Sequence, residues 1–510
     1  MKKLIIILMA ALPMLAIAQS TVNIKVDSIG KLATQLGDQK FKISELTVSG
    51  NVNGTDLKLI QEIVTRTKTD KKNPDECLVT AVDLSGITIV ESKDKGGLKT
   101  QTNALPKGLF AGAKNLSKVV LPASITAIEA QAFQNCENLP TIDLPAGLTL
   151  LGGEAFEGCK SLTAIQLPSG INKIESQTFK DCANLKTIEM PEGIKEIESS
   201  AFDGCKALES INLASVSILG GSAFKDCKNL KQVELNDLST IGQSAFSGCT
   251  SLETVKMEGA LADLNISTFK GCSSLSNISL PSSLKEISSH AFDGCQSLAE
   301  INIPESVAKI KDSAFQKCSS LKTVHLPSGL TNLGDDAFED CSSLESVTGL
   351  TLLNEIETNV FHNCGNLRKV ELPATVKRIG NNAFNGCSLL TDIEWPNALK
   401  TIEDGAFEKC ASLQSVNFPN GLKSIGSDAF MGCIQLTSVD LPATVKEIGS
   451  SAFQGCAALT SIIINSGTPP SISGSSFKGI NAAILIPKGS KAIYSADKKW
   501  SKVKGMKENK

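Results

Sequence analysis

Apolar residues return along this chain in one fixed frame. The copy that opens at Cys182 reads CANLKTIEMPEGIKEIESSAF, and its apolar positions are Leu185, Ile188, Met190, Ile194, Ile197, Ala201 and Phe202. The frame is continuous from Phe110 to Phe477, and 17 of the 19 Phe fall in one of its positions. Fifteen Cys lie in register from Cys136 to Cys456, at intervals of 23 residues except for two of 22. A period of this length indicates a repeat architecture.

The spacing predicts what each copy forms. Apolar residues alternate in I-x-L-P, which predicts a short strand with the intervening residue facing out. Pro ends that strand, because it has no N–H to donate. The following [ILV]-x-x-I turns a second segment inward, and A-F-x-x-C closes the coil with a turn. One coil cannot bury these residues alone, so the sequence predicts a stacked α/β repeat solenoid with parallel strands, one per coil of about 23 residues.

The signature C-x-x-L-x-x-I-x-L-P…I-x-x-x-A-F resembles the leucine-rich repeats of BspA-like (Treponema-type) bacterial surface proteins. The resemblance covers residues 105 to about 480, and ILIPKGSKAIYSADKKW (484–500) resembles the closing segment common in that family. It implies a leucine-rich-repeat solenoid. It also implies an exported, cell-surface or secreted binding protein, often credited with adhesion to matrix or other cells.

Four segments are expected. Residues 1–18 read as a secretory signal peptide, because Lys2 and Lys3 precede an apolar core and Ala16-Ile17-Ala18 forms a cleavage site after Ala18. Residues 19–104 read as an amino-terminal cap of strand, helix and strand, 105–480 as the repeat array, and 481–510 as a closing segment with a basic tail. Within the cap, Thr55 or Asp56 is expected to begin the helix. No later stretch is long and apolar enough to span a membrane.

The frame lapses in a few copies. Three successive copies lack Pro, with Ala214, Asn236 and Glu258 in its place, and both 22-residue intervals fall in this region. Two interpretations stay open. The lapses either reshape the surface into a binding site, or they are drift that a repeat array tolerates in its loops.

The in-register Cys allow three interpretations. No two are closer than 22 residues, which does not fit the close Cys pairs of metal sites. Stacking would bring neighbours within disulfide reach, but their number is odd. Their apolar setting favours buried, reduced core thiols. The three His (His290, His325 and His362) occupy different frame positions, and no catalytic motif is present. The sequence therefore predicts a protein that is not an enzyme, with no cofactor and no metal.

The outward strand positions form the expected ligand-binding face. This column is polar, mostly neutral or acidic, and contains no Phe, Tyr or Trp. Its members are Asp143, Gln166, Glu189, Asn212, Glu234, Lys256, Ser279, Asn302, His325, Thr348, Glu371, Glu394, Asn417 and Asp440. Without such aromatics, a weak, multivalent or extended contact fits best.

The balance of 50 basic against 53 acidic residues, with the signs interspersed, argues against nucleic acid as a partner. The expected partner is an extracellular or surface protein or glycan. The alternative is a passive structural or spacer component of the cell envelope. The sequence does not indicate which oligomeric state the protein adopts.

Overall fold

The structure is a computed structural model that describes residues 20–66, 79–93 and 95–509. The predicted signal peptide lies outside these residues. The chain folds into two compact units, residues 1–170 and 171–510. The expected boundaries after residues 104 and 480 stay predictions.

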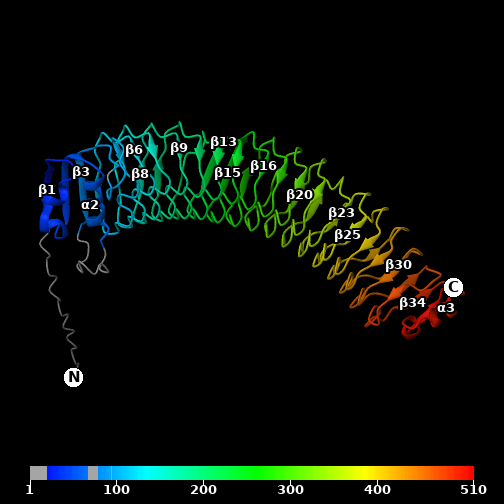
Figure 1. Ribbon diagram of the computed structural model, residues 1–510. Helices are drawn as coiled ribbons and strands as arrows, with labels where there is room; N and C mark the ends of the chain where they lie inside the picture. The colour runs from blue at the N-terminus through cyan, green and yellow to red at the C-terminus, as the bar shows by residue number, and fades with distance from the viewer. Residues whose placement is uncertain (1–19, 67–78, 94, 510) are drawn as a thin grey trace, which may run out of the picture. The chain divides into compact units, whose positions relative to one another are not determined.

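The first unit begins with a four-stranded parallel sheet in the order β1-β2-β3-β5, with α2 between β2 and β3 in the chain (Figure 1). A second sheet has the order β4-β6-β7. The elements are β1 (Thr21–Val26), α1 (Leu32–Leu36), η1 (Gly37–Phe41), β2 (Glu45–Val52), α2 (Gly54–Val64), β3 (Ala81–Ile89), β4 (Ala104–Leu105), β5 (Lys118–Val120), β6 (Ala127–Ile128), β7 (Leu150–Leu151) and β8 (Ala164–Gln166).

Helix α2 corrects one expectation. Its N-cap is Asn53, not Thr55 or Asp56. The Asn53 side chain accepts the backbone N–H groups of Thr55 (3.1 Å) and Asp56 (3.2 Å), and the Asp56 carboxylate accepts the Asn53 N–H (3.2 Å). This reciprocal arrangement satisfies donors that a helix start leaves open, so the helix begins at Gly54. Asp56 also accepts the N–H of Leu32 (3.0 Å), which ties α1 to α2.

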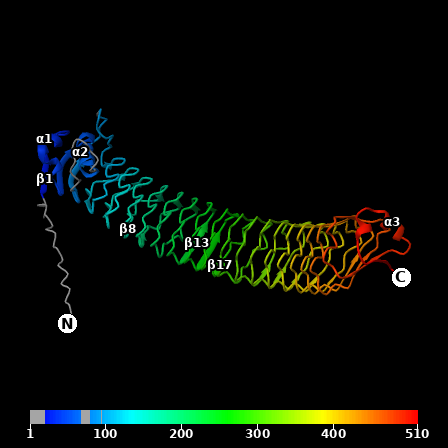
Figure 2. The ribbon, with the colours of Figure 1, turned by 90° about the horizontal axis from the view of Figure 1, so that it is seen from below.

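In the second unit, successive coils stack so that equivalent strands lie side by side (Figure 2). We call the strands that carry the I-x-L segment the first ladder. They are β10 (Thr187–Glu189), β13 (Gln232–Leu238), β15 (Thr254–Gly259), β17 (Asn277–Ser279), β20 (Thr323–His325), β22 (Ser346–Thr348), β24 (Lys369–Val370), β26 (Asp392–Ile393), β28 (Ser415–Val416), β30 (Ser438–Leu441) and β32 (Ser461–Ile464), followed by β34 (Ala483–Ile486) and β35 (Met506–Glu508).

The coils also contain a second short strand, formed by the [ILV]-x-x-I segment, and we call this column the second ladder. Its strands are parallel and in register. They are β9 (Lys173–Ile174), β11 (Glu196–Ile197), β12 (Ile218–Leu219), β14 (Thr240–Ile241), β16 (Asp263–Leu264), β18 (Glu286–Ile287), β19 (Lys309–Ile310), β21 (Asn332–Leu333), β23 (Glu355–Ile356), β25 (Arg378–Ile379), β27 (Thr401–Ile402), β29 (Ser424–Ile425), β31 (Glu447–Ile448) and β33 (Ser471–Ile472).

The core of each coil is filled by the frame residues. The in-register Phe rings stack on one another within each unit as far as Phe453, and the last of them, Phe477, packs against Trp500. From Phe179 to Phe453 neighbouring ring centroids are 5.0–5.8 Å apart. The residue before each Cys has a positive φ, as at Asp181 (58°) and Gly204 (78°). Gly, and less readily Asn or Asp, adopts this backbone at low cost, which explains why these residue types recur there in every copy except those with Lys317 and Lys409.

At the carboxyl-terminal end, α3 (Lys491–Ala496) and η2 (Trp500–Lys502) pack Tyr494 and Trp500 against the last coil. Both side chains are fully buried. The Tyr494 hydroxyl donates to the Ser466 carbonyl (2.7 Å), and the Trp500 indole N–H donates to the Pro470 carbonyl (2.7 Å). Among the described residues, no helix is long and apolar enough to cross a membrane.

Candidate functional site

All fourteen side chains of the expected ligand-binding face are exposed. Each follows a buried Ile or Val, as Glu189 follows Ile188 and Glu234 follows Val233. Alternation along a short strand produces this arrangement, because one side chain enters the core and the next faces solvent. The structure thus gives the column the orientation that the sequence predicts, while its role in binding stays a prediction.

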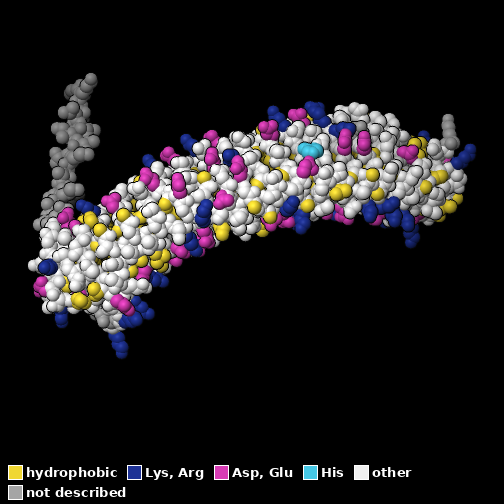
Figure 3. Space-filling model, turned by 90° about the horizontal axis from the view of Figure 1, so that it is seen from above, with side chains coloured by type: hydrophobic (Ala, Val, Ile, Leu, Met, Phe, Trp, Pro, Cys, Tyr) yellow, Lys and Arg dark blue, Asp and Glu magenta, His cyan; other side chains and the backbone are white. Residues whose placement is uncertain are grey.

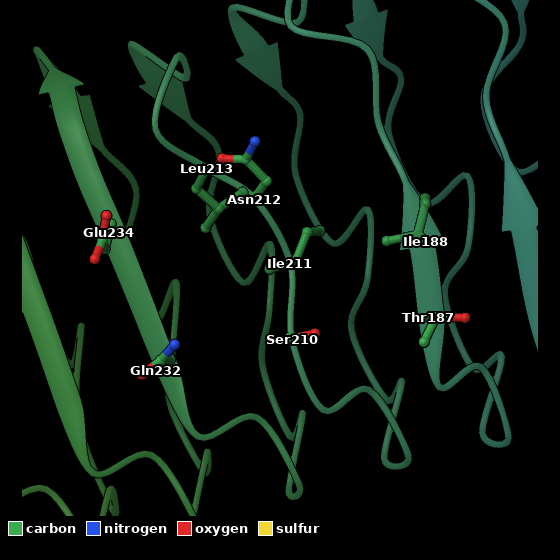
Figure 4. Close-up of a pocket in the computed structure, with 8 residues that line it drawn as sticks. All are labelled: Thr187, Ile188, Ser210, Ile211, Asn212, Leu213, Gln232 and Glu234. Atoms are coloured by element: carbon green, nitrogen blue, oxygen red, sulfur yellow. The ribbon is translucent and has the colours of Figure 1, made fainter.

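An open depression of about 490 Å³ marks one part of this column in the second unit. It lies over β10, residues 210–213 and β13, and Figure 4 shows its side chains on these three neighbouring segments. The lining residues are Thr187, Ile188, Ser210, Ile211, Asn212, Leu213, Gln232 and Glu234. Ile188 and Ile211 are only 8% and 9% exposed, so they form an apolar floor beneath hydroxyl, amide and carboxylate groups.

The depression lies where the repeat frame lapses. Residues 210–213 form no strand, and the Asn212 side chain accepts the backbone N–H of Ala214 (3.1 Å), the residue in the Pro position. In the next two coils, strands β13 and β15 run through Asn236 and Glu258. They are longer than the other strands of the first ladder, because a residue with a backbone N–H replaces Pro. The lapses therefore change the exposed surface at this place.

Three polar residues of the depression were not among the expected site residues. Thr187, Ser210 and Gln232 stand two positions before Glu189, Asn212 and Glu234. The period of two along a strand places both members of such a pair on the same face. The alternation in the sequence could have identified these three residues, because the outward face contains the residue before each buried Ile or Val as well as the residue after it.

The in-register Cys are core groups in this structure. All fifteen are free thiols, and every one except Cys456 is fully buried. Their Sγ–H groups donate to the Phe carbonyl of the preceding coil, as in Cys227 to Phe202 (3.2 Å) and Cys387 to Phe361 (3.2 Å). Burial raises the pKa of Cys272 to about 12 and that of Cys456 to about 11. Such thiols are poor nucleophiles and metal ligands, because both roles need the thiolate.

The three His do not come together. His325 lies on the first ladder, with Nδ1 2.9 Å from the Thr348 hydroxyl. Nδ1 of His362 is 2.8 Å from a Glu339 carboxylate oxygen, and Nδ1 of His290 is 3.2 Å from Asp293. Within the described residues, no group of three or more His, Cys, Asp or Glu side chains is placed to hold a metal ion.

The BspA type leucine rich repeat region matches residues 103–231, 195–322, 239–367 and 354–483, which together span well over half of the chain. The chain belongs to the BspA-type leucine-rich-repeat family. A solved leucine-rich repeat protein from Bacteroides ovatus is 30% identical, over 67% of this chain and 88% of that chain, with a TM-score of 0.57. No curated protein matches the chain.

Two further solved structures match this chain over a smaller share of its length or at lower sequence identity. The leucine-rich repeat protein of T. pallidum is 34% identical over 32% of this chain and 78% of its own, with a TM-score of 0.30. A leucine-rich cell surface protein from Faecalibacterium prausnitzii is 24% identical over 70% of this chain and 86% of its own, with a TM-score of 0.38. The BspA-type frame accounts for the interior of each coil, and the polar side chains of the depression stand at the variable positions of that frame.

Proposed function

We propose that this chain is an exported, non-catalytic binding protein that recognises an extracellular or surface protein or glycan through the outward face of its first ladder. The observation that carries the proposal is the depression over β10, residues 210–213 and β13. There, exposed polar side chains stand above the nearly buried Ile188 and Ile211. A hollow with an apolar floor and a few polar groups is the usual form of a ligand site.

The chemistry of the depression supports an extended polar ligand. Its hydroxyls and amides can donate and accept hydrogen bonds, and Glu234 adds one negative charge. No aromatic ring lines it, which argues against a tight anchor pocket for Trp or Tyr. The column continues beyond the depression, so a long ligand can gain affinity from several weak contacts.

Export is part of this proposal and is supported by the amino-terminal sequence. The charged pair Lys2 and Lys3, the apolar core and the Ala16-Ile17-Ala18 site have the order of a secretory signal. Cleavage after Ala18 is checked by sequencing the amino terminus of the secreted chain. A chain that keeps residues 1–18 and stays inside the cell contradicts this part.

Charge reversal tests the binding face. The secreted protein is applied to a panel of matrix proteins and glycans, and the ligand it retains is then measured with Glu189→Lys, Glu234→Lys and Glu371→Lys. For a ligand that meets these carboxylates, each variant changes affinity on the order of tenfold. Asp263→Lys is the matched control, because Asp263 is an exposed carboxylate on the second ladder. An equal effect of the control and Glu234→Lys moves the site away from the first ladder.

The alternative is a passive structural or spacer component of the envelope. The regular core favours it, because stacked coils form a long, uniform body without any ligand. The same panel separates the two. Specific, saturable retention of any member excludes a purely passive role, whereas a panel with no retention favours it.

A further inference from the structure

Four lysines occupy the same frame position in four successive coils of the second unit. We call them the lysine ladder: Lys377, Lys400, Lys423 and Lys446. Backbone hydrogen bonds hold them in register. The Lys400 N–H donates to the Lys377 carbonyl (2.8 Å), and each later lysine repeats this bond, at 2.8 Å for Lys423 and 2.7 Å for Lys446. All four side chains are exposed.

The other coils of this unit do not stack charge in this way. The same position contains Lys only at Lys195 and Lys285, each with uncharged residues in the coils before and after. The Lys195 ammonium is 3.5 Å from an Asp237 carboxylate oxygen. Across the described residues, by contrast, none of the four lysine-ladder ammonium groups forms an ion pair, and the nearby Glu355 and Glu403 carboxylates are paired with Arg378.

Unpaired stacking of this kind costs folding energy. Neighbouring strands lie ~4.8 Å apart, and like charges directly opposite each other on adjacent strands destabilise a sheet. The Lys400 side chain reaches toward the next coil, since its ammonium lies beside Gly421, where a Cβ would come within 2.5 Å of Nζ. A bound row of negative groups would offset the repulsion along the whole lysine ladder.

The surface is hollowed at the end of the lysine ladder. A pocket of about 480 Å³ lies beside Lys423 and Lys446, and Pro470 takes the lysine position in the next coil. Its other lining residues are Ala443, Thr444, Val445, Ser466, Thr468 and Pro469. The hydrogen bond from the Tyr494 hydroxyl to Ser466 fixes one wall. Figure 3 shows Lys and Arg side chains gathered along one edge toward this end of the chain.

We propose that the lysine ladder and its pocket bind a linear polysaccharide that carries sulfate or carboxylate groups. The charged groups lie along the ladder, and a sugar ring occupies the pocket, where hydroxyl and carbonyl groups can meet it. A single file of lysines matches one linear polyanion better than a broad membrane surface. No aromatic ring lines the pocket, so the base stacking that supports single-stranded nucleic acid is missing. The site is separate from the first ladder.

Affinity measurements on the mature chain test this. The probes are heparin (sulfate and carboxylate), hyaluronan (carboxylate only), neutral dextran and a single-stranded DNA oligonucleotide, each at several salt concentrations. We expect heparin or hyaluronan to bind with an affinity that falls as salt rises. Lys400→Gln/Lys423→Gln should lower that affinity on the order of tenfold and flatten the salt dependence.

Two control variants locate the effect. Lys195→Gln/Lys285→Gln removes two lysines from the same frame position without touching the lysine ladder. Lys502→Gln/Lys504→Gln/Lys507→Gln removes charge from the basic tail. Both should bind like the unmodified chain, and circular dichroism should be unchanged in every variant. Equal binding of dextran, tighter binding of DNA than of either polyanionic sugar, or a larger loss in a control than in the lysine-ladder variant overturns the proposal.

Discussion

Two parts of the second unit share one interior and differ outside. The coils around β13 and β15 lack Pro, whereas the coils that carry the lysine ladder retain it. Phe224 in the first part and Phe384 in the second are both fully buried. Their rings stack on the next Phe at 5.4 and 5.1 Å. The outer surfaces, in contrast, are a depression with a carboxylate and a row of unpaired lysines. The frame thus determines packing, and the variable positions determine chemistry.

The Pro position explains why the two surfaces can diverge without disturbing the core. In the lysine-ladder coils the strands β24 and β26 stop at Val370 and Ile393, before Pro373 and Pro396 are reached. Asn236 and Glu258 restore the backbone N–H, so β13 and β15 continue to Leu238 and Gly259. The change affects only residues after the buried Val or Ile, and the Phe and Cys positions stay as they are.

The largest expected effect is alkaline unfolding, which tests whether the two interiors are equivalent. Unfolded thiols titrate near pH ~8.5. Burial raises the pKa of Cys272 to about 12 and that of Cys456 to about 11. Above pH ~8.5 the unfolded chain therefore releases protons that the folded chain keeps. Stability should then fall by roughly 1.4 kcal/mol per pH unit for each buried thiol, until the folded pKa is reached.

Urea unfolding at increasing pH measures this loss. Cys227→Ala and Cys387→Ala remove one thiol from each part. Each should reduce the slope of the unfolding free energy against pH by the contribution of one thiol, roughly 1.4 kcal/mol per pH unit. A denaturation midpoint that does not move above pH ~8.5 contradicts the buried, protonated state of the thiols. A difference between the two variants shows that the interiors are not equivalent.

The second prediction removes one ring of the Phe stack from each part. Phe224→Ala and Phe384→Ala should each cost about 3–5 kcal/mol, because each leaves a cavity that the flanking rings cannot fill. Thermal and urea unfolding measure the loss, with the exposed Asn302→Ala as a control expected to change little. If Phe224→Ala costs much less than Phe384→Ala, the Pro-free coils are packed more loosely than their geometry indicates.

The third prediction exchanges the feature that separates the two parts. Glu258→Pro places a residue without an N–H inside β15 and should cost about 1–3 kcal/mol. Pro373→Ala in a regular coil should cost less than about 1 kcal/mol, because it mainly increases the conformational entropy of the unfolded chain. Urea unfolding gives both values. An equal cost for the two substitutions would contradict the explanation that β13 and β15 are long because Pro is missing.

Sequence reasoning reached the repeat, the inward positions and the outward column, because a period of 23 with alternating apolar residues leaves few ways to bury Ile188 and expose Glu189. It missed Thr187, Ser210 and Gln232 of the depression, which the same alternation could have identified, and two further features. Asn53 is the N-cap because the Asp56 carboxylate accepts the Asn53 N–H. That hydrogen bond depends on the helix and its neighbours being in place. The lysine ladder needs the register of four coils, although the lysines recur at the same frame position from Lys377 to Lys446.

The smallest expected effects distinguish two kinds of positive charge in adjacent positions. Arg378 lies between the Glu355 and Glu403 carboxylates, whereas its neighbour Lys377 begins the unpaired lysine ladder. Arg378→Gln should destabilise the fold by about 1 kcal/mol, because the carboxylates lose their counter-charge. Lys400→Gln/Lys423→Gln should instead stabilise it by a few tenths of a kcal/mol, because repulsion across the strands is relieved. Salt should reduce both effects. Urea unfolding at low and high salt measures them, and effects of the same sign would mean that the lysines are not an unbalanced charge in the folded chain.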